Sequence, residues 1–94
     1  MSFDLEGQRF VITGAGRGIG NAIGKRFTEL GARISAWDLN LDDIASDPDF
    51  EHSVQVDVTD EVSVAKGIEA SLGALGGLEG VIASAGINGP TKPT

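Results

Sequence analysis

Four glycines fall within eight residues near the N-terminus, in the stretch TGAGRGIG at positions 13 to 20. Glycine loses more conformational freedom on folding than any other residue, so this concentration is costly unless the backbone must closely approach another group. The stretch follows a short apolar run and precedes a helical pattern. A loop between a strand and a helix presents unpaired backbone N–H groups at the positive end of the helix dipole. This pattern predicts a binding site for a phosphate group.

The spacing of the glycines separates the candidate phosphate-binding loops. A Walker loop requires Gly-Lys-Ser/Thr at its end, but Gly24-Lys25 is followed by Arg26. The strict Gly-x-Gly-x-x-Gly form also fails, because it needs glycine at position 19 or 21, where Ile19 and Asn21 stand. The pattern that remains is Thr-Gly-x-x-x-Gly-Ile-Gly.

A carboxylate stands at the end of the next predicted strand. Asp38 closes the apolar run 34–37, and where a glycine loop between a strand and a helix binds a dinucleotide, an acid near this position accepts hydrogen bonds from the ribose hydroxyls. The same charge would repel the 2′-phosphate of NADP by about 1–4 kcal/mol at effective dielectrics of 80 to 20. This energy corresponds to a preference for NAD of roughly one to three decades. Asp38 could alternatively be a cap at the end of the strand.

The stretch from Thr13 to Gly20 resembles the pyrophosphate-binding motif of the short-chain dehydrogenases/reductases at every fixed position. The resemblance implies that the cofactor is held by Gly14, Gly16, Arg17, Gly18, Ile19 and Gly20. Leu39 stands where NADP-dependent relatives often carry Arg, although Arg17 could still reach a phosphate. We therefore expect NAD as the cofactor, with NADP the less favoured one.

Two later stretches also resemble this family. Asp57-Val58 matches the pair that contacts the adenine, although the same residues would also make a reasonable entry to the next helix. The run 81–86 lines up with the fourth strand and the Asn-Asn-Ala-Gly motif of the family. Ala85 and Gly86 match this motif, whereas Ala83 and Ser84 replace both asparagines.

Hydrophobic periodicity gives the elements that position these residues. Strands are predicted at residues 9–13, 34–37, 53–56 and 80–84, and one or two helical turns at 41–45. Two helices are predicted from apolar stripes, which are Ile19, Ile23, Phe27 and Leu30 in the first and Val64, Ile68, Leu72 and Leu75 in the second. Gly31 is expected to end the first helix in a left-handed conformation, and Thr59 to cap the second.

Alternating strands and helices predict an α/β fold with right-handed crossovers and a parallel sheet. The expected architecture is a Rossmann-like, doubly wound sheet whose first four strands lie in the order 3-2-1-4, incomplete as given. We interpret residues 1–94 as the N-terminal part of a single dinucleotide-binding domain whose remainder is absent from the chain. The fourth strand would then form an edge without a partner.

Composition excludes several other classes of protein. The net charge is −7, and residues 34–65 hold nine acids and no Lys or Arg, which argues against nucleic acid and membrane surfaces as partners. The chain has no cysteine, so it has neither a disulfide framework nor a thiolate metal site. No signal peptide or membrane-spanning run is recognisable, and a cytoplasmic location is expected. The only histidine, His52, is expected at the surface.

The family resemblance implies the NAD(H)-binding portion of an oxidoreductase that transfers hydride between the cofactor and an alcohol or ketone. Family members use a Tyr-x-x-x-Lys pair for proton transfer, but this chain contains no tyrosine, so no catalytic residue is assigned. No metal ligand is assigned either. The resemblance also implies a homotetramer when the protein is complete. The alternatives are a non-catalytic nucleotide-binding module and a truncated product with an interaction role.

Overall fold

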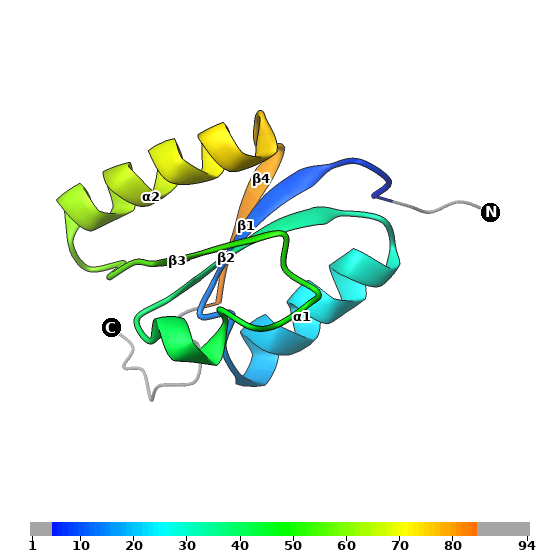
Figure 1. The fold of residues 1–94 in the computed structure, drawn as a ribbon, viewed down its shortest axis with the longest axis horizontal. Helices are drawn as coiled ribbons and strands as arrows, with labels where there is room; N and C mark the ends of the chain where they lie inside the picture. The colour runs from blue at the N-terminus through cyan, green and yellow to red at the C-terminus, as the bar shows by residue number, and fades with distance from the viewer. Residues whose placement is uncertain (1–4, 85–94) are drawn as a thin grey trace, which may run out of the picture.

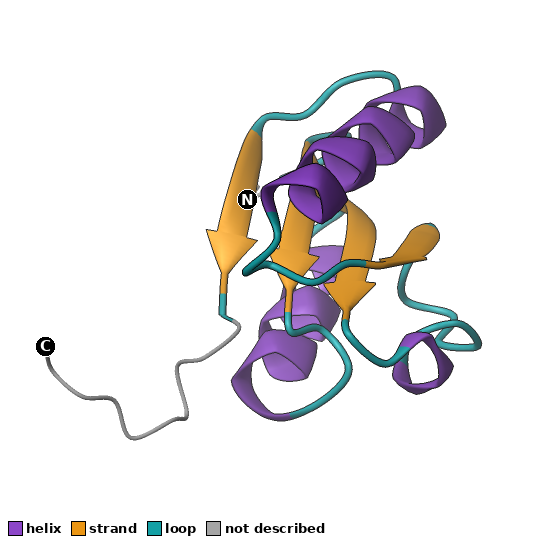
Figure 2. Ribbon diagram, turned by 90° about the vertical axis from the view of Figure 1, so that its left-hand side faces the viewer, coloured by secondary structure: helices purple, strands orange, loops and turns teal. Residues whose placement is uncertain are grey.

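The computed structural model describes residues 5–84, which fold into one four-stranded parallel sheet with a helix on each face (Figures 1 and 2). The elements in chain order are β1 (Arg9–Thr13), α1 (Gly18–Glu29), β2 (Arg33–Asp38), the 3-10 turn η1 (Leu41–Asp43), β3 (His52–Gln55), α2 (Glu61–Leu75) and β4 (Gly80–Ala83). The strand order is β3-β2-β1-β4, which confirms the predicted α/β class and topology. β1 has the predicted bounds, and the bounds of the other strands differ by one residue at one or both ends.

Each face of the sheet has its own hydrophobic core. Because side chains alternate along a strand, Val11 and Ile12 of β1 are both fully buried but on opposite faces. The core beneath α1 contains Ile12, Ala15, Ala32, Ile34, Ala36, Ile44 and Phe50. The core beneath α2 contains Val11, Trp37 and Val56. β4 is at the edge of the sheet, where Val81 is 50% exposed.

α1 packs against the sheet through two glycines, and this corrects one predicted core residue. Gly20 and Gly24 are buried, and a β-carbon on Gly24 would lie 2.6 Å from the Phe50 ring. Ile23 and Phe27 flank these glycines and pack against the core as predicted. Ile19 was expected in the same stripe but is 53% exposed. It lies about 100° around the helix from Gly20, outside the contact face that the glycines define.

The face of α2 that contacts the sheet is built around Trp37. A β-carbon on Gly67 would lie 2.9 Å from the Trp37 ring, and the indole Nε1 donates a 3.0 Å hydrogen bond to the Ser71 hydroxyl. The contact face of the helix therefore shifts toward these two small residues. Leu72 was predicted to face the core, but this shift leaves it 44% exposed.

His52 was expected at the surface, and it is only partly exposed. His52 opens β3 and is half-buried, with its Nδ1 atom 2.8 Å from the Ser35 hydroxyl. That hydroxyl lies 2.8 Å from the Ser71 hydroxyl, which also accepts the Trp37 indole N–H. The four side chains form one polar network beneath α2, so the network gives each buried polar group a partner.

The C-terminus of α1 ends at the predicted residue, whereas the N-terminus of α2 has a different cap from the predicted one. Gly31 has φ 96°, and the Ala32 and Gly31 amides donate to the carbonyls of Phe27 and Thr28, which completes a Schellman motif as predicted. Thr59 was predicted to cap α2, but the cap is Asp60, whose carboxylate accepts from the Val62 amide at 3.0 Å. Thr59 instead donates to Asp57, which takes it out of the capping position.

Within residues 5–84 neither helix has the length and apolar character that crossing a membrane requires.

Candidate functional site

The predicted site residues gather at the carboxyl end of the sheet. Thr13 and Trp37 are register partners on the adjacent strands β1 and β2, so the loops that follow them start side by side. The Ala15 amide donates to the Trp37 carbonyl at 3.0 Å, which joins the glycine loop to β2. The arrows of β1, β2 and β4 point toward this end of the sheet, where α1 begins (Figure 2).

The glycines of the loop meet two different requirements. Gly14 and Gly18 have φ of 63° and 60°, in the left-handed region that other residues rarely adopt. Gly20 instead allows a close approach, because a β-carbon there would collide with the Gly14 carbonyl oxygen and the Ser84 hydroxyl. The start of α1 is therefore held directly against the end of β1.

Asp38 is tied to the glycine loop, although it lies 22 residues further along the chain. Its Oδ2 accepts a 2.8 Å hydrogen bond from the Gly16 amide, and its Oδ1 accepts a 3.0 Å bond from the Asn40 amide. A β-carbon on Gly16 would lie 2.7 Å from the same Oδ2, so only glycine fits here without displacing the carboxylate. A carboxylate oxygen has two acceptor positions, so each oxygen can still accept from a ligand hydroxyl.

The N-terminus of α1 has no side-chain cap. Arg17 is the N-cap residue in extended conformation, its side chain accepts no capping bond, and the first turn contains no acid. The first amides of the helix precede the first intrahelical bond, which runs from the Asn21 amide to the Arg17 carbonyl at 3.4 Å. These amides and the helix dipole favour an anion at this point.

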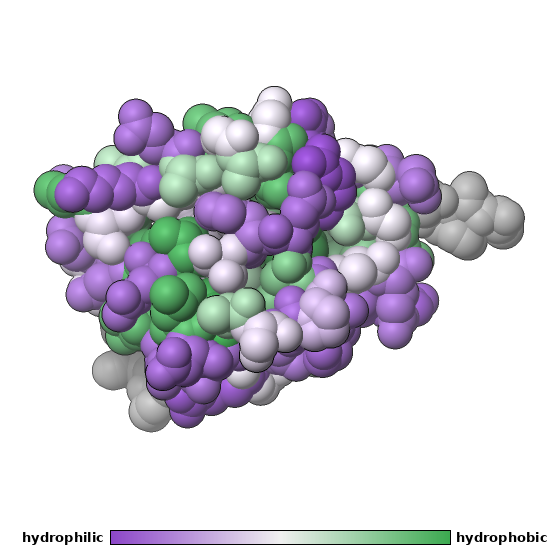
Figure 3. Space-filling model, in the orientation of Figure 1, coloured by the Kyte–Doolittle hydropathy of each residue, from purple (hydrophilic) through white to green (hydrophobic). Residues whose placement is uncertain are grey.

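Two further predicted contacts, Leu39 and Val58, lie beyond the carboxyl ends of β2 and β3. Leu39 directly follows β2 and is 63% exposed, and Val58 lies three residues after the end of β3 and is 44% exposed. Small hydrophobic areas interrupt the mostly hydrophilic surface between η1 and α2 (Figure 3). Ile19, exposed in the first turn of α1, lies at the loop itself.

Asp57 is already engaged within the chain. Its Oδ1 accepts from the Thr59 amide at 2.9 Å and from the Thr59 hydroxyl at 2.6 Å, and these hydrogen bonds lower the pKa of the Asp57 carboxyl. The Asp57 amide donates to the Ser63 hydroxyl at 2.9 Å. Both bonds from Thr59 use Oδ1. Asp57 therefore organises the entry to α2, and its Oδ2 takes no part in these two bonds.

Ser84 joins the end of β4 to β1. Its amide donates to the Thr13 hydroxyl at 3.0 Å, and its buried hydroxyl donates to the Thr13 carbonyl oxygen. One serine therefore fixes the two strands at the place where the resemblance led us to expect asparagine. The predicted contacts Ala85 and Gly86 lie outside the described residues.

The structure adds two residues that sequence reasoning missed. Asp43 Oδ2 lies 3.1 Å from Arg17 Nη2, and Asn21 Nδ2 donates to the Ala15 carbonyl at 3.1 Å, which braces the loop from inside α1. The acid-rich run 38–51 held no signal that distinguished Asp43 from its neighbours. Asn21 had a weak signal, since it is a polar residue in the first turn of a predicted helix.

The described part of the chain suits binding better than proton transfer. Residues 5–84 contain no group of three or more His, Cys, Asp or Glu side chains that could hold a metal ion. The chain as a whole contains no tyrosine. What the site offers is a row of backbone amides, a carboxylate with unused acceptor positions and flanking apolar surface.

Comparison with known proteins agrees with this geometry. The family model described as short chain dehydrogenase matches residues 8–94. The 2-dehydro-3-deoxy-L-rhamnonate dehydrogenase (NAD(+)) of Sphingomonas sp. (strain SKA58) is 37% identical over 90 residues, which cover 93% of this chain and 36% of that protein.

Solved structures share the fold. A 3-ketoacyl-(acyl-carrier-protein) reductase from Brucella melitensis complexed with NADH gives a TM-score of 0.77 at 29% identity, over 83% of this chain and 34% of that chain. A short chain dehydrogenase/reductase from Burkholderia phymatum in complex with NAD gives 0.71 at 28% identity, over 84% and 31%. This chain therefore spans about a third of the length of the relatives it matches.

Proposed function

Because the chain belongs to the short-chain dehydrogenase family, we propose that it binds NAD(H) at the carboxyl end of its sheet, as the cofactor-binding part of an oxidoreductase. The observation that carries the proposal is the bond between Gly16 and Asp38. It places a carboxylate with free acceptor positions beside an uncapped helix N-terminus. A dinucleotide needs both groups, one for a ribose and one for the diphosphate.

The residues present fit the cofactor. Gly20 holds the start of α1 closely against the end of β1, and the first turn of α1 holds no acid to compete with a diphosphate. The diphosphate would be held by Gly14, Gly16, Arg17, Gly18, Ile19 and Gly20. Asp38 and Leu39 would bind the adenosine ribose, and Asp57 and Val58 the adenine. Ala85 and Gly86, beyond the described residues, complete the proposed set.

NAD is the proposed cofactor rather than NADP. The Asp38 carboxylate accepts from ribose hydroxyls but repels a 2′-phosphate by about 1–4 kcal/mol, which is more than a contact to an exposed arginine recovers. The Sphingomonas relative is named for NAD(+), and the two structures above were solved with NADH and NAD.

The bound nicotinamide would accept hydride from an alcohol or donate it to a ketone. The residues of this stretch bind and orient the cofactor, and the proton-transfer groups are proposed to lie in the rest of the protein.

Residues 1–94 would then be the N-terminal part of one dinucleotide-binding domain. A cytoplasmic location and a homotetramer are proposed from the family resemblance, and light scattering on the complete protein would test the tetramer.

Calorimetric titration of the complete protein tests the cofactor proposal. We expect heat of binding with NADH and at least tenfold weaker binding of NADPH. Asp38→Ala should narrow this ratio by about tenfold or more, because it removes the repelling charge. An unchanged ratio in the variant would exclude Asp38 as the selecting group, and a protein that binds neither nucleotide would refute the proposed function.

A further inference from the structure

A short turn folds back from the end of β2 onto the glycine loop. In η1 the Asn40 side chain accepts from the Asp42 amide at 3.0 Å, and the Asp43 amide donates to the Asn40 carbonyl at 3.1 Å. These bonds bring Asp43 against the loop, since a β-carbon on Gly16 would lie 2.6 Å from the Asp43 β-carbon. The backbone of the turn therefore determines where the Asp43 carboxylate lies.

Asp43 pairs with the arginine of the glycine loop. Its Oδ2 lies 3.1 Å from Arg17 Nη2, and the two side chains are 31% and 75% exposed. Asp38 lies at the same loop through its bond to Gly16. Two carboxylates and one guanidinium leave this corner with a net charge of −1, although the loop itself carries a cation.

This charge arrangement affects the two nicotinamide dinucleotides differently. An arginine near the adenosine ribose accommodates the 2′-phosphate of NADP in Rossmann-type folds. A phosphate monoester carries a charge of about −2, so it is repelled by the net negative corner. It must also share the Arg17 guanidinium with Asp43, whose carboxylate already pairs with Nη2 and offsets part of its positive charge. NAD, which has a hydroxyl at this position, meets neither obstacle.

On the premise that this loop and Asp38 bind NAD(H), we propose that Asp43 is a specificity-determining residue that disfavours NADP by holding Arg17. Asp38 acts on the ribose position directly, whereas Asp43 acts by pairing with the guanidinium that a 2′-phosphate would use, which orients it and offsets part of its charge. The two acids therefore differ in one testable respect. The effect of Asp43 depends on Arg17, and the effect of Asp38 does not.

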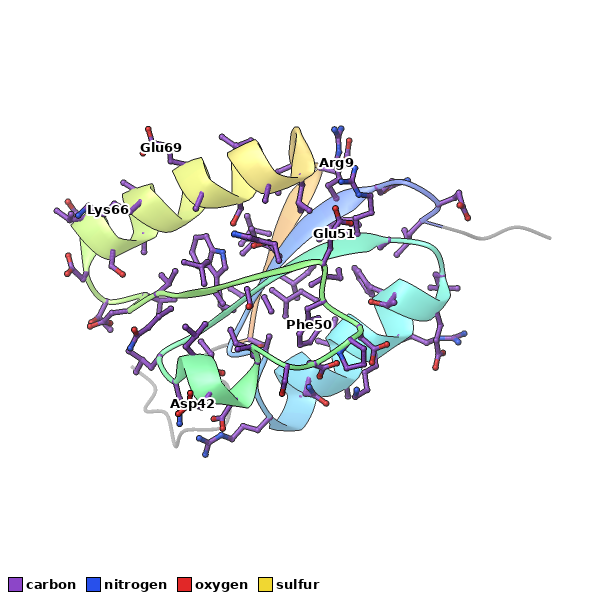
Figure 4. All side chains as sticks on the ribbon, viewed as in Figure 1. Arg9, Asp42, Phe50, Glu51, Lys66 and Glu69 are labelled. Atoms are coloured by element: carbon purple, nitrogen blue, oxygen red, sulfur yellow. The ribbon has the colours of Figure 1, made fainter. Side chains whose placement is uncertain are left out.

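The test measures the dissociation constants of NADH and NADPH on the complete protein by calorimetry. Asp43→Asn should shift the ratio toward NADPH by about three- to tenfold, which is the range expected for releasing an exposed ion pair and removing one nearby charge. Asp42→Asn is the matched control, because Asp42 lies in the same turn (Figure 4) and forms no ion pair within residues 5–84. Its ratio should stay within twofold of the wild type.

A double-mutant cycle shows whether Asp43 acts through Arg17. In an Arg17→Gln background, Asp43→Asn should lose most of its effect on the ratio, because only the direct repulsion between the Asp43 charge and the 2′-phosphate remains. An unchanged ratio in Asp43→Asn, an equal shift in Asp42→Asn, or a full shift in the Arg17→Gln background would each overturn the inference. Asp43→Ser provides the same measurement if the Asn variant does not fold. A wild-type protein that does not bind NADH would instead refute the proposed function.

Discussion

α1 begins after Arg17, whose side chain caps nothing, whereas α2 begins after Asp60, whose carboxylate accepts the Val62 amide at 3.0 Å. The first turn of α1 contains no acid, and the first turn of α2 contains Glu61. α2 therefore satisfies one of its N-terminal amides and complements its dipole from within the chain. α1 leaves these groups available, at the point where the glycine loop brings its N-terminus against β1.

The difference distinguishes polar groups that stabilise the fold, at the start of α2, from polar groups that are available to a ligand, at the start of α1. A missing cap costs about 1 kcal/mol of stability, which a bound anion can recover at the same amides. Lys66 and Glu69 lie on the side of α2 away from the sheet and are exposed (Figure 4), whereas the buried Ser71 hydroxyl is bonded to Ser35 and Trp37.

Alanine at two glycines should give opposite results in the two helices. Gly20→Ala places a β-carbon against the Gly14 carbonyl and the Ser84 hydroxyl, so we expect a loss of about 1–3 kcal/mol of stability and at least tenfold of NADH affinity. Gly73→Ala in α2 meets open space and should stabilise the protein by about 0.5–1 kcal/mol. Urea unfolding and calorimetry on the complete protein measure both. Equal effects at the two positions would contradict the close packing of Gly20.

A carboxylate at the N-cap of α1 should make the start of this helix resemble that of α2, with a capped and negatively charged N-terminus. In Arg17→Asp the new side chain can accept from the first-turn amides and repel a diphosphate, so NADH affinity should fall about tenfold more than in Arg17→Asn. The Asn variant is the control, because it also caps the helix and also loses the arginine but adds no charge. Both should change stability by no more than about 1 kcal/mol. Equal NADH affinities in the two variants would show that the diphosphate does not lie there.

Removing the existing cap should affect stability alone. Asp60→Ala leaves the Val62 amide without its acceptor, and we expect a loss of about 1 kcal/mol by urea unfolding with NADH affinity within twofold of the wild type. Asp60→Asn keeps an accepting oxygen and should lose only a few tenths of this amount. A large change in NADH affinity in the Ala variant would remove the distinction between the two helix starts.

The smallest effect concerns acid stability at the opposite end of the sheet. Glu79, which follows α2, bonds Arg9 through both carboxylate oxygens, and these bonds lower its pKa from 4.5 to about 2. The stabilisation from this pair is therefore complete above pH 4.5 and is lost as the pH falls through about 2.

Glu79→Gln should be less stable than the wild type at neutral pH, with the difference shrinking between pH 4.5 and 2. Glu69→Gln removes the same charge from the outer face of α2 and is the control. Thermal unfolding across this pH range measures the difference. A constant difference between Glu79→Gln and the wild type would exclude the ion pair as its source.

Local signals were sufficient for the strands and the glycine loop, because apolar patterns, turns and helix ends depend on neighbouring residues. The strand order was predicted instead from the doubly wound arrangement that this succession of strands and helices matches. The errors at Ile19 and Leu72 share a cause, since glycines at 20, 24 and 67 form contact surfaces that a search for apolar side chains does not recognise. His52 and Asp43 were missed for another reason. Their partners Ser35 and Arg17 are distant in sequence, and only the folded sheet brings them together.

Hydrogen exchange of the complete protein with and without NADH tests the contrast most directly. We predict that bound NADH slows exchange of amides at residues 14–21 and 38–40 and leaves the start of α2, residues 59–64, unchanged. Protection that appears at the start of α2, or no protection in the glycine loop at saturating NADH, would contradict the assignment of the cofactor to the uncapped helix.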